Sequence, residues 1–374
     1  MTGLRILVVT RSYPAADDLY QYPFVHRRVL AYREAGHAVE VFRPGAPGVH
    51  EYEGVTCRSG DSSALRALAQ HFRPDVVAAH GVSEAMWPTL GILDDLPICA
   101  WLHGSEIPAF FRRKAEAIVD NAQRATALDA VEKRRGFWLG ILSDTAQMRL
   151  VFPSHSAVRM MSEDLGDRFN NFAVIPNPID TNLFRYQPKA SELRLAVLSI
   201  RPFDSPTYAN DLSVAAILLL SQRPVFHQLR FTIIGDGPLF EETLRPLIDL
   251  PNVTISRQFL TQSEIAEEHS RQGIFLVPTR LDTQGVSRDE AMSSGLVPVT
   301  NGIPAVLEFA DERSAAIAPP GDAAALADGI SEMIESPELF QRRSVAAAAR
   351  VRGQSANDIV IPAELGLLAE AAHG

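Results

Sequence analysis

The chain has 374 residues, of which 46% are hydrophobic and 21% are charged, so it is long enough to form two folded domains of ordinary composition. Its formal net charge of -10 argues against general nucleic-acid binding, which needs a basic surface. No apolar run reaches the ~18 residues of a transmembrane helix, and residues 6–9 are too short a run for a signal peptide. Cys57 and Cys99 match no metal-site spacing, which favours packed free thiols and a cytoplasmic location.

The first half of the chain alternates short apolar runs with helical patterns. Buried strands are predicted at residues 5–10, 38–42, 76–79, 98–102, 150–153 and 173–176. Residues 24–35 form an amphipathic pattern that Gly36 closes, so they predict a helix between the first two strands. Repeated strand–helix–strand units predict a doubly wound parallel sheet.

Two of these strands end in a histidine followed by a glycine. They are His80-Gly81 and His103-Gly104. Polar residues at the carboxyl ends of parallel strands lie where α/β proteins bind their ligands. Both histidines are therefore candidate site residues, and a strand-end histidine bonded to backbone stays open as the alternative for each, more so for His80.

Two segments combine cations with large apolar residues. Residues 110–114 (FFRRK) run from Phe110 to Lys114, and residues 133–142 (KRRGFWLGIL) run from Lys133 to Leu142. This combination is typical of a surface that contacts anionic lipid, and a helix covering the core with a solvated basic flank explains it equally well. The first interpretation predicts peripheral contact with a membrane.

The second half repeats the α/β pattern. Strands are predicted at residues 195–200, 231–234, 253–256, 274–277 and 297–300, and a helix at residues 323–334. Arg201 follows the first of these strands, and the tight turn Gly235-Asp236-Gly237-Pro238 follows the second. These residues are expected at the ligand-binding edge of a second parallel sheet.

Residues 275–300 (FLVPTRLDTQGVSRDEAMSSGLVPVT) predict a strand, a corner and a helix. Asp282 and Gly285 lie in the polar loop, Ser287 is the expected N-cap, and the helix runs through Glu290 until Gly295 stops it. The first backbone N–H groups of a helix have no partner within it, so this corner suits a phosphate, while the two carboxylates suit sugar hydroxyls.

This corner resembles the acid-x7-acid signature of the retaining glycosyltransferases of family 4, which have the GT-B fold. Asp282 replaces the usual first glutamate, and the remaining matches are Pro278, Gly285, Glu290, Ala291, Met292, Gly295, Pro298 and Val299. Three further segments resemble family motifs in the same order: HGSE at residues 103–106, PNPID at residues 176–180 and GDGP at residues 235–238. The resemblance covers residues 4–352.

The resemblance implies two Rossmann-like, doubly wound domains that face each other across a cleft. Their expected bounds are residues 1–185 for an acceptor domain and residues 186–352 for a nucleotide-sugar donor domain. Residues 353–374 form a C-terminal segment that is expected to cross back to the first domain.

The resemblance also implies transfer of a sugar, with retention, from a nucleoside diphosphate (UDP or GDP) to a saccharide or lipid-linked acceptor. Surface polysaccharide, lipopolysaccharide or glycolipid synthesis in bacteria is the expected setting. Glu290 would bind the ribose hydroxyls and Asp282 a hydroxyl of the donor sugar. His103 would contact the donor sugar or the incoming acceptor. The residues expected at the diphosphate and nucleotide are Arg201, Gly235, Arg280, Gly285, Val286 and Ser287. No Asp-x-Asp pair occurs, so neither a metal nor a cofactor is expected.

Two departures from the family stand out. Where Lys-Gly-x-Asp-Leu is usual, residues 208–212 read YANDL, so the lysine that would face the diphosphate is missing. Arg280 and Arg288 are candidates for the second cation, with a surface ion pair as the alternative for each. The first loop, which includes Tyr20 and Tyr22, lacks the glycines that the family often places near the phosphates.

Three other classes of protein are alternatives to a glycosyltransferase. A nicotinamide oxidoreductase is disfavoured because no G-x-G-x-x-G follows Thr10. An epimerase of GT-B fold would need a carboxylate and histidine pattern that is not found. A non-catalytic partner subunit is the strongest alternative, since the missing lysine and Asp282 would fit a decayed site.

Overall fold

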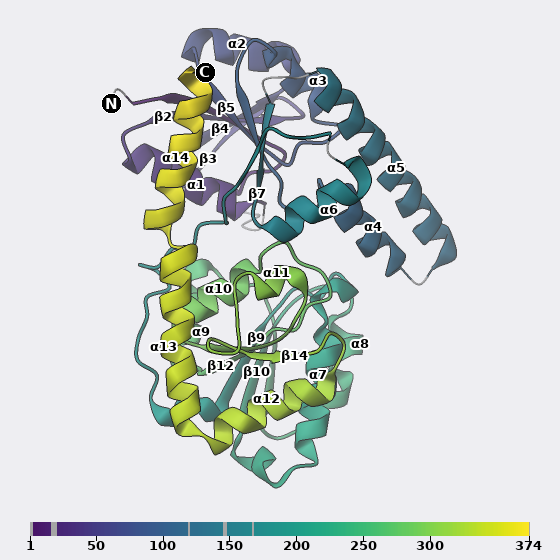
Figure 1. Cartoon of the computed structure of the whole chain (residues 1–374), viewed down its shortest axis with the longest axis vertical. Coiled ribbons are helices and arrows are strands. Elements are labelled where there is room, and N and C mark those ends of the chain that lie inside the picture. Colours follow the sequence, from purple (N-terminus) through teal and green to yellow (C-terminus); the bar gives the residue numbers. More distant parts are fainter. Residues whose placement is uncertain (1–2, 16–20, 119, 145–147, 167, 374) are drawn as a thin grey trace. The chain divides into compact units, whose positions relative to one another are not determined.

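A computed structural model describes residues 3–15, 21–118, 120–144, 148–166 and 168–373 (Figure 1). The chain forms two compact units: unit 1 is Met1–Asn177 with Val360–Gly374, and unit 2 is Pro178–Ile359. The chain thus leaves unit 1 after Asn177, earlier than the expected boundary at residue 185. The reason is that Ile179 and Phe184 are buried in a core cluster of unit 2. The chain returns to unit 1 at Val360, later than the expected boundary at residue 352. The reason is that Ala356 still pairs with Ile179 of unit 2.

Unit 1 contains an eight-stranded sheet, counted over its described residues, in the order β3-β4-β2-β1-β5-β6-β7-β8. All neighbouring strands in this sheet run parallel except β3 and β4. The strands are β1 (Arg5–Thr10), β2 (Ala38–Pro44), β3 (Gly48–Tyr52), β4 (Val55–Gly60), β5 (Val76–His80), β6 (Ile98–Trp101), β7 (Met148–Phe152) and β8 (Phe172–Val174).

The connections of unit 1 diverge on either side of β1. The chain passes from β1 to β2 on one side, and returns through α2 to β5 on the other. The carboxyl ends of β1 and β5 therefore meet at a topological switch point, where α/β sheets bind ligands. The helices of this unit are α1 (Pro23–Glu34), α2 (Ser62–Phe72), α3 (Trp87–Leu90), α4 (Pro108–Glu116), α5 (Asn121–Asp144), α6 (His155–Leu165) and α14 (Asn357–His373).

The hairpin of β3 and β4 was not predicted. Its turn is formed by Glu53 and Gly54, which both have positive φ (43° and 74°), as the two-residue turns of hairpins require. No residue of β3 is fully buried, so the strand has no apolar run that sequence patterning would detect.

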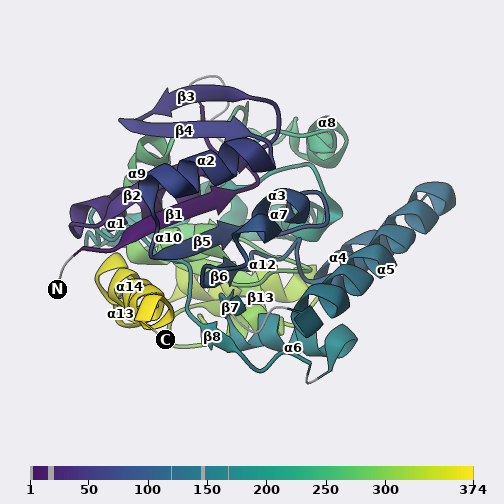
Figure 2. The same cartoon turned by 90° about the horizontal axis from the view of Figure 1, so that it is seen from above.

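Helices α4 and α5 pack side by side and extend away from the sheet (Figure 2). Trp138 in α5 is fully buried and its Nε1 donates to the carbonyl of Glu106, 2.7 Å away. The guanidinium of Arg134 lies 4.1 Å from the ring centroid of Phe111. The aromatic residues of segments 110–114 and 133–142 thus contribute to the packing of this helix pair, and none of them is among the exposed large hydrophobic residues of the described chain.

The cations of these two segments are largely paired with carboxylates. Arg112 pairs with Asp164, Arg113 pairs with Glu163 at 2.6 Å, and Lys133 pairs with an aspartate one turn earlier in α5 at 2.8 Å. This pairing agrees with the second interpretation, a helix pair with a solvated flank, and membrane contact through these segments stays a prediction. None of the described helices has the length and apolar composition needed to cross a membrane.

The C-terminal helix α14 contributes to the core of unit 1. Glu364 is fully buried in it, and its carboxylate accepts from Arg28 Nε (2.9 Å), the Tyr32 hydroxyl (2.6 Å) and Trp101 Nε1 (3.2 Å). A second nitrogen of Arg28 donates to Asn177 Oδ1 at 3.0 Å. One arginine thus binds both chain segments that lead out of the unit. Both cysteines are buried and free, as expected.

Unit 2 contains a parallel six-stranded sheet, counted over its described residues, in the order β11-β10-β9-β12-β13-β14. Its strands are β9 (Ala196–Ile200), β10 (Arg230–Gly235), β11 (Val253–Arg257), β12 (Ile274–Leu276), β13 (Val297–Asn301) and β14 (Ala316–Ala318). Its helices are α7 (Asn210–Ser221), α8 (Phe240–Leu244), α9 (Gln262–Arg271), α10 (Val286–Ser293), α11 (Pro304–Leu307), α12 (Ala323–Glu335) and α13 (Pro337–Gln354).

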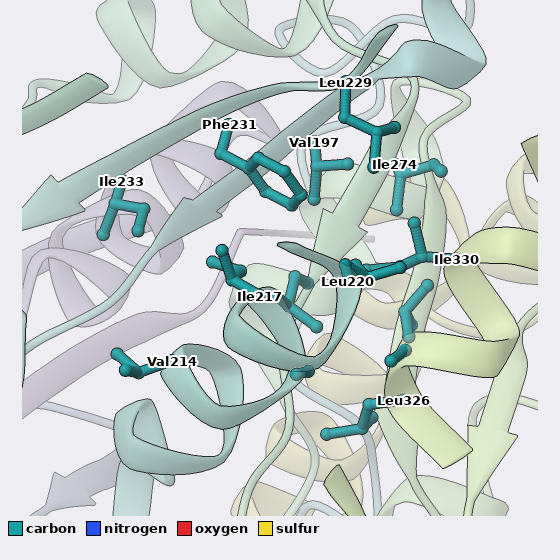
Figure 3. Close-up of a cluster of buried hydrophobic side chains, with 14 of the residues drawn as sticks. Val197, Val214, Ile217, Leu220, Leu229, Phe231, Ile233, Ile274, Leu326 and Ile330 are labelled. Atoms are coloured by element: carbon teal, nitrogen blue, oxygen red, sulfur yellow. The ribbon is translucent and has the colours of Figure 1, made fainter. Parts of the chain in front are cut away.

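The main core of unit 2 lies between one face of this sheet and two helices. Figure 3 shows Ile217 and Leu220 of α7 and Ile330 of α12 pointing toward side chains of the strands, among them Phe231 and Ile274. Each of these five side chains is at least 96% buried. This packing fixes the strand ends from which the candidate site is built.

The buried network around Glu364 predicts that α14 is essential to unit 1. Glu364→Ala leaves the buried Arg28 without its carboxylate and should lower the free energy of unfolding of unit 1 by about 3 kcal/mol or more. All three tryptophans lie in unit 1, so their fluorescence in urea reports its unfolding. The control is Glu370→Ala on the same helix, whose exposed pair with Arg149 should contribute at most about 1 kcal/mol. Equal losses in the two variants would contradict the prediction.

Candidate functional site

The candidate site of unit 2 lies at the topological switch point of its sheet. From β9 the chain passes to β10 on one side, and it returns through α9 to β12 on the other. Arg201 follows β9, and the acidic corner of residues 278–287 follows β12, next to β9 in the sheet. Two of the expected site segments are therefore brought together at the edge where such sheets bind ligands.

The helix of the corner begins two residues earlier than expected. Helix α10 starts at Val286, and Gly285 rather than Ser287 is its N-cap, with φ 100° and ψ 58°. Ser287 lies in the first turn, where its backbone N–H has no acceptor in the helix and can point to a ligand. Asp282 Oδ1 accepts from the backbone N–H groups of Thr283 (2.8 Å) and Gln284 (3.2 Å), so the carboxylate also stabilises its own loop.

Arg288 supports the corner from beneath. Its buried guanidinium donates to Asp289 Oδ1 (2.7 Å) and to the carbonyl of Gln284 (2.6 Å), and Gln284 Nε2 donates to the other oxygen of Asp289 (3.0 Å). A Cβ on Gly285 would lie 2.9 Å from the guanidinium. Only glycine therefore fits there, both for its backbone conformation and for this contact.

Arg201 is a buried cation that no carboxylate pairs with, as far as the described residues go. Its side chain is 6% exposed and donates to Ser287 Oγ at 3.3 Å, which joins it to the first turn of α10. Within the described part of the chain, its Nε and second terminal nitrogen have no hydrogen-bond partner. Burial lowers the pKa of Arg201, and the nearby Asp282 carboxylate offsets part of this effect. A buried guanidinium of this kind favours the binding of an anion.

Gly235, expected at the nucleotide, positions Arg201 through the backbone. A Cβ on Gly235 would lie 2.0 Å from the carbonyl oxygen of Arg201, and one on Gly237 would lie 2.3 Å from the carbonyl carbon of Phe203. The backbone N–H of Arg201 donates to the carbonyl of Ile234 at 3.0 Å. The glycines of this turn thus allow the loops after β9 and β10 to lie in direct contact.

Both candidates for the second cation are paired with carboxylates. Arg280 donates to both oxygens of Asp211 (2.7 and 2.6 Å) and to the carbonyl of Pro206 (2.8 Å), and Arg288 pairs with Asp289. An ion pair was the alternative left open for each arginine. The partner of Arg288 is its sequence neighbour, whereas the partner of Arg280 could not be foreseen, because Asp211 is 69 residues away.

Glu290 lies in α10 beyond the first turn and is partly buried. Burial, followed by the like charge of Asp289, raises the pKa of Glu290 to about 8, while a hydrogen bond with Gln262 opposes the shift. The carboxyl is therefore largely protonated at neutral pH, and hydroxyl groups that donate to it would favour the ionised form.

The two candidate histidines meet in unit 1. His80 Nδ1 and His103 Nε2 are 3.1 Å apart, and the His80 ring is stacked between Trp101 (5.0 Å) and His103 (5.4 Å). Burial holds the pKa of both histidines well below the ordinary range, so both rings are neutral at pH 7. The backbone alternative does not describe His80, because its partner is the other histidine.

A ring cluster beside His103 was not predicted. Phe24 lies 4.5 Å from His103 and 4.9 Å from Tyr22, measured between ring centroids. Tyr22 has a left-handed backbone (φ 58°, ψ 50°), and a Cβ on Gly81 would lie 3.1 Å from its ring. Tyr20, the other tyrosine of this loop, lies outside the described residues. No pattern in the sequence identifies such a cluster, because it depends on backbone conformation.

In the described parts of the chain, no group of three or more histidine, cysteine or acidic residues is arranged to hold a metal ion.

The raised pKa of Glu290 predicts a pH-dependent stability. The folded state keeps a proton that the unfolded state loses between about pH 4.5 and about pH 8, so stability falls as the pH rises through this window. Glu290→Gln cannot ionise and should flatten the fall. The measurement is Tm by circular dichroism from about pH 5 to about pH 9, with Glu335→Gln at the exposed end of α12 as the control that should follow the wild type. A Glu290→Gln curve parallel to the wild type would contradict the prediction.

Comparison with protein families gives two matches. The family described as Glycosyltransferase Family 4 matches residues 24–183, and the family described as Glycosyl transferases group 1 matches residues 197–336. A comparison with curated proteins gives no match.

Several solved structures share the fold over nearly the whole chain. Sucrose-phosphate synthase from Thermosynechococcus elongatus has 16% identity and a TM-score of 0.76, with 98% of each chain covered. HepE from Anabaena, in complex with UDP and glucose, has 15% identity and a TM-score of 0.71, covering 98% of this chain and 100% of its own. A UDP-forming α,α-trehalose-phosphate synthase from Burkholderia vietnamiensis has 13% identity and a TM-score of 0.71, covering 99% and 98%.

The first family match lies mainly in unit 1 and the second lies in unit 2, and each includes two of the four segments that resemble family motifs. The chain belongs to the family 4 glycosyltransferases (glycosyl transferases group 1), and its two Rossmann-like units have the GT-B architecture.

Proposed function

We propose that this glycosyltransferase transfers a sugar, with retention, from a nucleoside diphosphate to an acceptor hydroxyl, and that it binds the donor at the switch point of unit 2. The proposal rests on the surroundings of Arg201. This arginine is buried, contacts the first turn of α10 through Ser287, and has two nitrogens that find no hydrogen-bond partner among the residues that the structure describes.

The diphosphate is assigned to Arg201 and the first turn of α10. The backbone N–H groups of Val286 and Ser287 and the positive end of the helix dipole favour an anion there. Arg201 supplies the full positive charge. As the bond between the sugar and the diphosphate breaks, negative charge grows on the leaving oxygen, and a fixed cation stabilises it.

The two acids of the corner are assigned to hydroxyl groups of the donor. Glu290 accepts from the ribose, and Asp282 accepts from the sugar through its second oxygen, since Oδ1 binds two backbone N–H groups. Because the pKa of Glu290 is raised to about 8, donor binding near neutral pH draws a proton from this carboxyl.

The reaction exchanges one bond at the sugar. The bond from its anomeric carbon to the diphosphate oxygen breaks, a bond to the acceptor oxygen forms, and the proton of the acceptor hydroxyl leaves with the nucleoside diphosphate or passes to water. The resemblance of the corner to retaining enzymes supports retention.

UDP is the first choice of nucleotide, and GDP is the second. HepE was solved with UDP and with UDP-glucose, and the trehalose-phosphate synthase is UDP-forming. These relatives support a uridine nucleotide for this chain.

We assign acceptor recognition to unit 1, at the carboxyl edge of β1, β5 and β6. His103, Tyr22 and Phe24 offer ring faces and a neutral imidazole there, which suit a saccharide. A role in surface polysaccharide, lipopolysaccharide or glycolipid synthesis is supported by the family resemblance. The helix pair α4–α5 adds no support for a membrane-bound acceptor, because its cations are largely paired and its aromatic residues are packed.

The proposal predicts that the protein binds UDP or GDP through Arg201. Isothermal titration with UDP, GDP, ADP and TDP, without and with EDTA, should identify one nucleotide whose affinity EDTA does not change. Arg201→Ala removes a charge-assisted contact and should weaken that affinity roughly 10- to 100-fold. The control is Arg313→Ala. This arginine is 91% exposed and precedes β14, so it lies at the amino ends of the strands, whereas Arg201 lies at their carboxyl ends.

Two outcomes would contradict the proposal. A wild-type protein that binds no nucleoside diphosphate would remove the donor site. A protein that binds the nucleotide but neither transfers nor hydrolyses the corresponding sugar nucleotide would instead be the non-catalytic partner subunit.

A further inference from the structure

Tyr208 lies directly beside the proposed diphosphate site. It is the last residue of a short 3-10 turn, Pro206–Tyr208, in the connection between β9 and α7. The guanidinium carbon of Arg201 lies 4.9 Å from the centroid of the Tyr208 ring. The ring is only partly exposed, so the contact is largely shielded from water.

Among the residues that the structure describes, Arg201 contacts an aromatic ring and not a carboxylate, and this difference affects how it can bind a ligand. The Arg201 guanidinium carbon lies over the Tyr208 ring, whose π-electrons attract the cation without bringing a carboxylate or a negative charge to it. A carboxylate partner would hold Arg201 equally well, but it would occupy the donors and repel an anionic ligand. The two unpaired nitrogens of Arg201 are what an aromatic support leaves available.

Arg280 and Thr279, which follow β12, fix the turn that carries Tyr208. The backbone N–H of Arg280 donates to the carbonyl of Thr207 (2.9 Å), and so does the hydroxyl of Thr279 (3.2 Å). The Arg280 side chain then donates to the carbonyl of Pro206 and to both oxygens of Asp211. The pair of Arg280 and Asp211 therefore has a second consequence, because it holds both ends of the segment that contains Tyr208.

The backbone after Tyr208 is unusual for its residue type. Ala209 has φ 52° and ψ 33°, a left-handed conformation that residues with a Cβ rarely adopt. It is fully buried and directs the chain from the turn into α7. Such conformations persist where the surrounding contacts determine them, and they concentrate at functional sites.

We propose that Tyr208 is a positioning residue for the donor diphosphate. Its ring holds the guanidinium of Arg201 in place and adds no carboxylate to it, and the Arg280–Asp211 pair anchors the turn. This rests on the proposed function. It gives Arg280 an indirect part in donor binding, in place of the direct contact expected from the sequence.

The test separates the effect of the Tyr208 ring from that of its hydroxyl group, and it compares a nucleoside diphosphate with the monophosphate. Isothermal titration measures the affinities of wild type, Tyr208→Phe and Tyr208→Leu for UDP and UMP, or for GDP and GMP if the protein binds guanosine. Tyr208→Phe keeps the ring and should stay within about 2-fold of wild type. Tyr208→Leu should weaken the diphosphate roughly 3- to 30-fold, the range of a cation–π contact, and the monophosphate less.

A matched control exists in the same unit. Arg352 lies 5.3 Å from the ring centroid of Tyr186, a second arginine–tyrosine contact that is partly exposed. Tyr186→Leu should leave UDP binding unchanged. If Tyr208→Leu does not fold, Asp211→Asn replaces it. Asp211 is 60% exposed, and Asp211→Asn removes the ion pair that holds the Arg280 side chain against the turn, so UDP affinity should fall in the same direction.

Each outcome bears on the proposal. Unchanged UDP affinity in Tyr208→Leu, or an equal loss for UDP and UMP, would overturn it, since the second result is that of a structural defect. A loss in Tyr208→Phe as large as in Tyr208→Leu would overturn the role of the ring. A wild-type protein that binds no nucleoside diphosphate would overturn the proposed function as well, whereas normal wild-type binding with an unaffected Tyr208→Leu would overturn this inference alone.

Discussion

The divergence of the chain at the centre of the second parallel sheet is the constraint on which the site depends. Strands β9 and β12 are neighbours, yet their connections to the rest of the sheet leave in opposite directions. The loop after β9 delivers Arg201, and the loop after β12 turns into α10. The two meet at the contact between Arg201 and Ser287, 3.3 Å apart. A cation and the N-terminus of a helix thus lie together at the edge where open α/β sheets bind ligands.

The pairing of charges then decides what each arginine near this edge does. Arg288 is bound to Asp289 beneath the corner, and Arg280 is bound to Asp211 on the connection to α7. Both therefore stabilise backbone. Arg201 is held by a hydroxyl and by the ring of Tyr208, neither of which cancels its charge. An anion that enters the site meets one cation whose cost of burial has already been met by folding.

Much of the fold could be predicted from the sequence, because buried parallel strands are short apolar runs between polar loops. Each strand predicted from such a run is present, with bounds that shift by a residue or two. Strands β3, β4 and β14 were missed. β3 is largely exposed, β4 has no continuous buried run, and β14 has only three residues. The first boundary between the units was placed too late, because Ile179 and Phe184 were assigned to the end of the first domain and belong to a core cluster of the second.

The sequence by itself determined which chemistry reaches the strand ends: the acids and glycines of the corner, Arg201 after β9, and a histidine after each of β5 and β6. Tertiary structure decided which of these groups are available to a ligand. Ion pairs such as Arg280–Asp211 and Arg28–Glu364 join residues 69 and 336 positions apart. The left-handed backbones of Tyr22 and Ala209 are likewise imposed by packing. Local patterns report burial and turns, but the partner of a charge depends on which distant segment the fold brings beside it.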